Sequence, residues 1–189
     1  MADYGVVLTE KIKATKVGPL FHLVYEDADL QNGMICMVGD IEEDGKLEVR
    51  KVVQPETAKL KTETIALIAD PEVIYSEELR STNSLQNYYI PAGNVFRAYH
   101  LATGDIFAVS ENMIDLVDYE VEVGNYVIPQ DGSFKMLEAA SVTWDNQAFV
   151  GKIIDTRTIG TAAYVGDSGE VGRSIKLVGI EVQKNHRND

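Results

Sequence analysis

Cysteine is almost absent from this 189-residue chain, because Cys36 is the single one. An intramolecular disulfide is therefore excluded. Cys36 lies in the apolar run GMICMVGD, where a thiol usually behaves as a small buried hydrophobe. Histidine is scarce too, since the chain has only His22, His100 and His186, and their positions give no zinc-binding spacing. We expect neither a metal nor a cofactor.

Long apolar runs are also missing. No run approaches the roughly 18 residues that a membrane-spanning helix needs. The opening residues MADYGVVLTEKIKATK lack a basic segment followed by an apolar one, which is the pattern of a secretory signal. We therefore expect synthesis in a cytoplasm and no membrane partner.

Positive charge is in short supply. Seventeen Lys and Arg residues stand against 30 Asp and Glu residues, for a net charge of -13, which disfavours binding to nucleic acid or anionic lipid. The first sixteen residues differ, with Lys11, Lys13 and Lys16 against Asp3 and Glu10. Two interpretations stay open, because this local excess of lysine either reflects chance and solubility or helps the segment dock on an acidic neighbour.

Helical pattern is scarce, and strand pattern dominates. Short runs rich in β-branched and aromatic residues alternate with Gly, Asn and Asp. The predicted strands are 20–25, 33–41, 46–53, 64–70, 94–101, 105–114, 125–130, 148–159, 161–166 and 175–182. Residues 76–85 and 135–141 could each form a turn or two of helix, but neither carries the long apolar stripe of a core helix.

The turn residues favour antiparallel connections. Asp44-Gly45 and Asp131-Gly132 predict hairpin turns, and Asn32-Gly33 opens another strand. Parallel strands would need helical crossovers, for which the chain has almost no room. The sequence therefore predicts a mainly β protein, an antiparallel β-barrel or sandwich with an extended N-terminal arm and one or two short helices.

The predicted organisation has three parts. The N-terminal arm covers residues 1–18, a β-rich sub-structure covers 19–85, and a barrel or sandwich sub-structure covers 86–189. The boundary follows the polar run RSTNSLQN, after which the composition shifts. The alternative, that the last two parts form one domain, stays open.

The stretch IPAGNVFRAYHLATGDIFAVS, residues 90–110, is interpreted as a β-hairpin that turns at Gly104-Asp105. One face of its first strand would carry Arg97, and the other would carry His100. The alternative is a polar triad of Arg97, His100 and Asp105 at the mouth of a pocket. Residues 101–110 and 121–130 share a hydrophobe, a glycine, an Asp or Asn and then a strand, which suggests one local solution used twice.

Patterns of catalysis and metal binding are incomplete. GDSG, residues 166–169, resembles the nucleophile loop of trypsin-like serine proteases, but Glu170 replaces its second glycine, and an unaided Ser168 is a weak nucleophile. DADLQNG, residues 27–33, departs from a calcium-binding loop at the positions of Gln31, Asn32 and Val38. We therefore expect no catalytic residue and no enzyme.

Two further features carry open interpretations. The acidic pairs of the chain lie in hydrophilic turns, where a solvated surface is expected rather than acid–base chemistry. Trp144, the single tryptophan, lies between polar residues, and is either a partly buried core residue or an exposed interface anchor.

Six segments together carry a resemblance to a known family: VVLTEKIKATKVGPLFHLVYEDADLQNGMICMVGD, IALIADPEVIYSEE, IPAGNVFRAYHLATGDIFAVS, VGNYVIPQDGS, FVGKIIDTRTIGT and IKLVGIEV. They resemble structural proteins of tailed bacteriophages that infect Firmicutes. The resemblance implies a β-rich capsid decoration protein on the exterior of the virion, synthesised in the cytoplasm of a bacterial host. It also implies the major capsid protein as partner and a homo-oligomer, with a trimer favoured. A phage tail-tube or connector protein and a small β-barrel hydrolase remain as alternatives.

Such decoration proteins need an extended segment that adds a strand to a sheet edge of the capsid protein. The N-terminal arm fits this need, because its residues alternate and no apolar partner for them is evident nearby in the sequence. The predicted docking residues are Val6, Val7, Leu8, Lys11, Ile12, Lys13 and Lys16.

Overall fold

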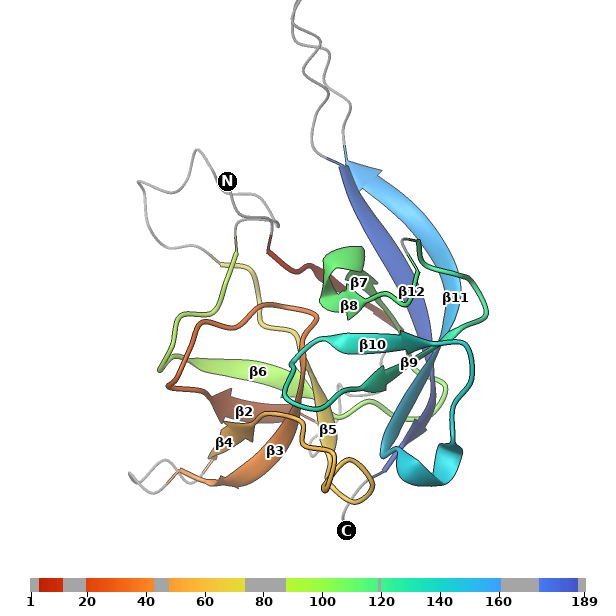
Figure 1. The fold of residues 1–189 in the computed structure, drawn as a ribbon. Helices are drawn as coiled ribbons and strands as arrows, with labels where there is room; N and C mark the ends of the chain where they lie inside the picture. Colours follow the sequence, from red (N-terminus) through yellow and green to blue (C-terminus); the bar gives the residue numbers. More distant parts are fainter. Residues whose placement is uncertain are drawn as a thin grey trace, which may run out of the picture.

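The structure, a computed structural model, describes residues 4–11, 20–42, 48–73, 88–118, 120–160 and 174–186. Within these ranges the chain forms two β-sheets and two short 3-10 turns, and no α-helix (Figure 1). The prediction of a mainly β protein is confirmed. The short helix predicted over residues 135–141 is wrong, because strand β10 (Met136–Ala139) lies there. The other predicted helix, over residues 76–85, lies outside the described residues.

The first sheet has five strands and closes on itself. Its strands are β2 (Leu20–Val24), β3 (Ile35–Ile41), β4 (Val49–Val53), β5 (Ile65–Ile68) and β6 (Val95–Tyr99). Their order is β2-β4-β3-β5-β6, and β2 also pairs with β6. Every strand therefore has a neighbour on both sides, and the sheet has no edge strand.

The second sheet has seven strands, in the order β1-β7-β12-β11-β9-β10-β8. Besides β10, its strands are β1 (Val7–Lys11), β7 (Ile106–Ser110), β8 (Ile114–Asp115), β9 (Tyr126–Pro129), β11 (Phe149–Gly160) and β12 (Ser174–Asn185). The 3-10 turns are η3 (Glu111–Met113), between β7 and β8, and η4 (Trp144–Asn146), before β11. This sheet does have edges, at β1 and at β8.

Each sheet contains one parallel pair, which the turn residues did not predict. β2 pairs in parallel with β4, and β8 pairs in parallel with β10. In both cases the third of three consecutive strands lies between the first two, as the orders β2-β4-β3 and β8-β10-β9 show. The intervening antiparallel strand reverses the chain, so this arrangement needs no helical crossover.

The hairpin predicted over residues 90–110 is wrong. Strand β6 pairs with β2 and β5, whereas β7 pairs with β1 and β12, so the two runs belong to different sheets. The turn at Gly104 exists, but it carries the chain from one sheet to the other. The predicted alternation along β6 is confirmed, since Arg97 is exposed while Phe96 and Ala98 are buried. A local pattern fixes which face a side chain takes, and leaves the choice of partner strand to the rest of the chain.

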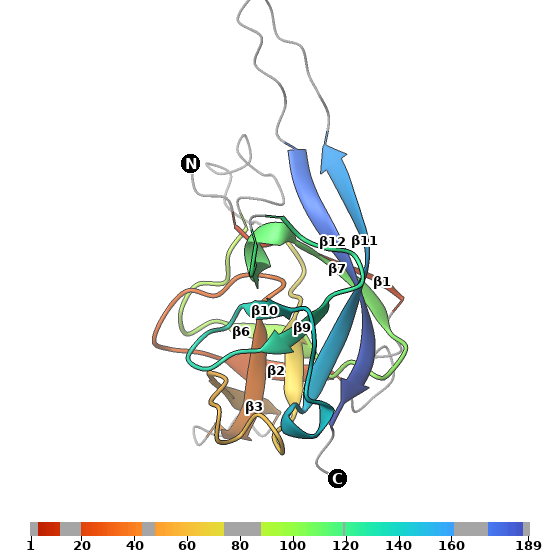
Figure 2. The same ribbon diagram turned by 45° about the vertical axis from the view of Figure 1, so that its right-hand side comes forward.

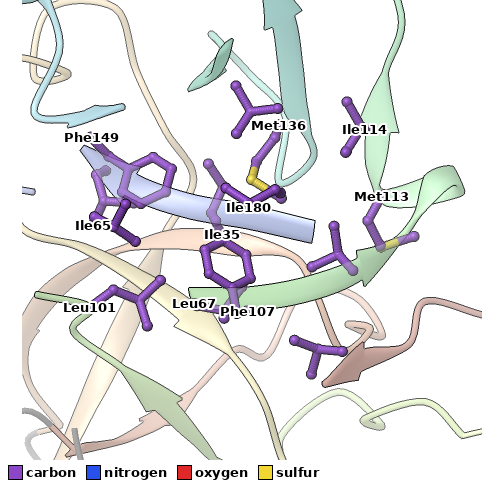
Figure 3. Packing of buried hydrophobic residues seen from close by; sticks show 14 of the residues in the cluster. Ile35, Ile65, Leu67, Leu101, Phe107, Met113, Ile114, Met136, Phe149 and Ile180 are labelled. Atoms are coloured by element: carbon purple, nitrogen blue, oxygen red, sulfur yellow. The ribbon is translucent and has the colours of Figure 1, made fainter. Parts of the chain in front are cut away.

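Two apolar clusters form the core. The smaller one fills the inside of the closed sheet and includes Leu23, Cys36 and Phe96. The larger one lies between the sheets, and Figure 3 shows Leu67 close to Phe107 there. Strand β5 contributes to both clusters, because Ile65 and Leu67 join the larger one and Ala66 and Ile68 join the smaller. Burial on both faces explains why this strand is apolar throughout.

A glycine turn recurs where strands begin. Gly104 has a φ of 87°, which favours glycine, and its N–H donates to the Val182 carbonyl at 2.8 Å. The Val182 N–H in turn donates to the Asp105 carbonyl at 2.9 Å, so two residues oppose one, as in a glycine β-bulge. Two more glycines repeat these paired bonds: Gly124 opposite Ile153, and Gly33 opposite Ile68. The predicted likeness of residues 101–110 and 121–130 is confirmed, with a third example.

Among the described residues, no helix has the length and apolar character that crossing a membrane requires.

Candidate functional site

The predicted docking segment begins with β1, an edge strand of the seven-stranded sheet. β1 runs antiparallel to β7, with Val7 opposite Val109 and Leu8 opposite Ala108. Val6 extends the pairing, because its N–H donates to the Ser110 Oγ at 2.9 Å and its carbonyl accepts from the Ser110 N–H at 2.8 Å. One long side of β1 therefore lies against β7.

The apolar side chains of this segment lie in the core of their own chain. Val6 is 0% exposed and Val7 is 7% exposed, while Leu8 is half-buried. The prediction of an extended arm outside the core is therefore corrected for Val6 and Val7. Val7 joins the cluster between the sheets, with partners that are remote in sequence and so escape a local pattern. Docking on a capsid protein would use the outer side of β1 and stays a prediction.

The lysines of the predicted segment lie beyond the part described in full. Lys11 is the last residue of β1, and only its backbone is described. Ile12, Lys13 and Lys16 lie outside the described residues. β1 also has one residue more than β7 between Leu8 and Lys11, which marks a bulge. Bulges and lysines are features by which natural edge strands discourage indiscriminate pairing.

A second open edge lies on the ribbon formed by β11 and β12. Both strands are twelve residues long and pair along their whole length. β11 pairs with β9 only at Gly151 and Lys152, and its last bonds to that side are made by Ile153 with the turn at Gly124 and Asn125. Beyond this point β12 still pairs with β7 as far as Leu177, and only the far end of the ribbon projects from the body (Figures 1 and 2). The outer edge of β11 over residues 154–160 has no strand partner among the described residues.

The ribbon is tied to η3 near its far end, at the level of Thr158. The Lys176 Nζ lies 2.6 Å from the Glu111 Oε1, and both side chains are partly shielded from solvent. On its other side β12 pairs with β7 from Leu177 to Glu181. β12 is thus held along its length from Lys176 to Glu181, while the outer edge of β11 over residues 154–160 has no strand partner in the described part of the chain.

A buried asparagine organises the main polar network of the closed sheet. Asn32 is 0% exposed; its Oδ1 accepts from the Asp70 N–H at 2.8 Å and its Nδ2 donates to the Asp70 carbonyl at 2.9 Å. The Asp70 carboxylate accepts from the Tyr88 hydroxyl and, at 3.1 Å, from the Arg97 N–H. Glu72 lies at the margin, 3.4 Å from the Asn32 Nδ2. The sequence marked Asn32 only as a turn residue, because its partners follow some forty residues later.

Burial raises the pKa values of two ionisable groups in this network, Glu72 and Tyr88. It raises the pKa of Glu72, and the Asp70 charge adds to that shift, while the hydrogen bond from Asn32 opposes it. Burial also raises the pKa of the Tyr88 hydroxyl, assisted by its hydrogen bond to Asp70. Tyr88 therefore stays protonated and donates to Asp70 at neutral pH. These bonds tie together the loops around Asn32, Asp70 and Tyr88, which is a structural role.

Arg97, His100 and Asp105, the predicted polar triad, each interact with a different partner. Arg97 contributes its backbone N–H to Asp70, and the His100 Nε2 lies 3.3 Å from the His186 carbonyl oxygen. Asp105 is 1% exposed, and its Oδ2 accepts from the Ala102 N–H at 2.8 Å. That bond closes the glycine turn before β7, which is an Asx cap. Ser168 lies outside the described residues.

A cavity of about 720 Å³ opens beside β3 and β4. Its apolar lining is Phe21, Met37, Val38 and Val53, and its charged lining is Asp40, Arg50, Lys51, Lys59 and Glu63. Part of this charge is paired within the chain, since Lys51 lies 3.7 Å from Glu42 and Lys59 lies 3.3 Å from Glu56. The mixed signs give the cavity no clear preference for an anion or a cation.

The remaining candidates have plain roles. Cys36 is fully buried, and burial raises the pKa of its thiol to about 12, so it is a core residue as expected. Trp144 is 42% exposed and packs edge-on against Tyr126 at 5.8 Å between ring centroids, so it lies at the surface. In the part of the chain that the structure describes, no group of His, Cys, Asp and Glu could hold a metal ion.

Comparisons with protein-family models, with curated proteins and with solved structures find no match for this chain.

Proposed function

We propose that this chain is a structural protein of a tailed-bacteriophage virion that decorates the outside of the head by binding the major capsid protein. In this proposal the closed five-stranded sheet is a small barrel that acts as a rigid body, and strand edges of the other sheet make contacts with neighbours. The observation that carries the proposal is the β11–β12 ribbon, whose far end projects from the body (Figure 2) and in which the outer edge of β11 over residues 154–160 has no strand partner among the described residues. The resemblance of the sequence to phage structural proteins supports it.

The physical argument rests on how strand edges bind. An exposed edge offers a row of N–H and C=O groups that a neighbouring chain can pair with, and such pairing binds extended segments in many assemblies. Among the described residues, the edges at β1, at β8 and at distal β11 all lie on the seven-stranded sheet. A protein with this arrangement is suited to joining its neighbours in a lattice.

Cross-linking mass spectrometry on intact virions tests the proposal. We expect cross-links from Lys11, Lys13 and Lys16 to the major capsid protein, because Lys11 ends the edge strand β1 and the other two follow it in the sequence. Cross-links of the same lysines to tail proteins would overturn it in favour of a tail-tube or connector protein. Turnover of a hydrolase substrate that is lost on changing His100 or Ser168 would overturn it in favour of an enzyme.

A salt series on purified heads gives an independent check. We expect the protein to remain on heads in high salt with only a modest loss, because main-chain pairing and apolar burial are screened much less than surface charge. Complete release at moderate salt would instead indicate attachment through exposed ion pairs alone.

A further inference from the structure

The open edge of β11 has the composition of a strand that accepts a partner. Residues 154–160 read IDTRTIG, with four β-branched residues and neither proline nor lysine. Natural edge strands are usually protected from unwanted pairing by proline, by lysine or by a bulge. β1 has such a bulge between Leu8 and Lys11. The bulge of β11 lies at Ile154, at the base of the open edge, so the five residues that follow before Gly160 are regular.

The charges on this edge are complementary to those on the same edge of a second copy of the chain. Asp155 and Arg157 are both exposed, and residues two apart in a strand lie on the same face of the sheet. When two copies of the edge run antiparallel with Thr156 opposite Thr156 of the second copy, Asp155 of each faces Arg157 of the other. Opposite charges directly across two strands stabilise the pair.

We infer that the β11 edge pairs antiparallel with the β11 edge of a second copy of this chain, about a two-fold axis at Thr156. The two ribbons then form one four-stranded sheet in the order β12-β11-β11-β12. This contact is isologous, as two-fold symmetry requires. It goes beyond the proposed function; both start from the open β11 edge, but the association of the isolated chain tests this contact and cross-linking on virions tests the other.

The neighbouring strand leaves space for this contact. Within the ribbon, Asp155 lies opposite Gly179, which has no side chain to cover the carboxylate. Arg157 lies opposite Leu177, which is 0% exposed and gives the stem of the arginine an apolar neighbour. A shift of the register by one pair would place Arg157 opposite Arg157, where like charges repel. Charge complementarity therefore selects both the occupant and the register.

A charge-swap series tests the pairing. The chain is examined by sedimentation velocity over a range of protein concentrations. A range is needed because an edge this short buries less than the roughly 1,200 Å² of a stable interface, so we expect a weak dimer. D155R and R157D each place like charges across the two-fold axis, and we expect each to raise the dimer dissociation constant roughly tenfold or more. The double variant D155R/R157D restores opposite charges, and we expect it to restore dimerisation.

Charge-matched controls come from the closed sheet. E56K and K59E change an exposed ion pair by the same amounts of charge, and we expect neither to alter dimerisation. Hydrogen exchange should show greater protection at high protein concentration for those amides of residues 155–159 that point away from β12. A chain that is monomeric throughout, a double variant as weak as the single ones, or single variants equal to the controls would each overturn the inference.

Discussion

The two sheets of this protein differ in how they treat their edge strands, whose outer backbone groups have no partner in the sheet. In the five-stranded sheet the pairing of β2 with β6 gives every strand two neighbours. In the seven-stranded sheet β1 and β8 lie at the edges, and β11 runs on past its partner β9. Closing a sheet removes its sites for strand addition, whereas an open sheet keeps them. The comparison shows that one chain can combine a sheet without edge strands and a sheet that keeps them.

The two sheets nevertheless share a core. Ile35 and Leu67 of the closed sheet pack in the same cluster as Phe107 and Ile180 of the open one (Figure 3). The outer side of the closed sheet would expose these apolar residues if the other sheet were absent. We therefore expect the sheets to unfold together.

The largest expected effect comes from the shared cluster. Phe107 is 0% exposed, and Phe107→Ala should lower the free energy of unfolding by about 4 kcal/mol, because it opens a large cavity between the sheets. Urea unfolding followed by circular dichroism and by Trp144 fluorescence should give one coincident transition for both probes. Phe96→Ala, inside the closed sheet, should shift the Trp144 signal as well, although Trp144 lies beside the open sheet. Two separate transitions would show that the sheets are independent.

A smaller effect is expected at Gly5, just before β1, where the backbone packs against Asn32 and Met113. A Cβ on Gly5 would lie 2.5 Å from the Met113 Sδ and also against the Asn32 carbonyl. Gly5→Ala should therefore cost about 2 kcal/mol and speed hydrogen exchange of the Val6 amide, because β1 is displaced from β7. Gly93→Ala is the matched control, since its added Cβ meets open space and the cost is limited to the strain of a positive φ, about 1 kcal/mol. Equal effects of the two changes would contradict close packing at Gly5.

The smallest expected effect concerns pH. Because burial raises the pKa of Glu72 above its ordinary value of 4.5, folding favours the protonated carboxyl. Its contribution to stability is present below pH 4.5 and is lost as the pH rises through the raised pKa. Glu72→Gln keeps an acceptor for Asn32 without the charge, so it should be slightly more stable than the parent at pH 7. Thermal melts should show this gain vanish below pH 4.5, while Glu56→Gln, at an exposed site, should show no gain.

The existence of most strands could be predicted from the sequence, because short β-branched runs between turn residues carry that signal locally. β10 was mistaken for a helix, since KMLEAAS is rich in helix formers, and its pairing with β9 and β8 overrides that preference. β6 and β7 were joined into one hairpin because adjacent runs usually pair, whereas here the chain changes sheets between them. Partner choice depends on contacts that no local window contains.

In the candidate site too, local features could be predicted from the sequence and long-range contacts could not. The turn at Gly104-Asp105 could be predicted, and Asp105 proves to cap it through the Ala102 N–H. The position of Val6 and Val7 in the core could not be predicted, because their partners on β7 lie about a hundred residues away in the sequence. The open edge of β11 likewise follows from where β9 ends beside it, which the sequence of β11 alone does not show.

The position of β1 has a consequence for biosynthesis. The chain leaves the ribosome N-terminus first, yet the Val6 amide must wait for Ser110, 104 residues later, before it finds its bond. Throughout that interval the nascent chain carries an unpaired, valine-rich strand, and the lysines that follow it supply the charge repulsion that keeps neighbouring nascent chains apart.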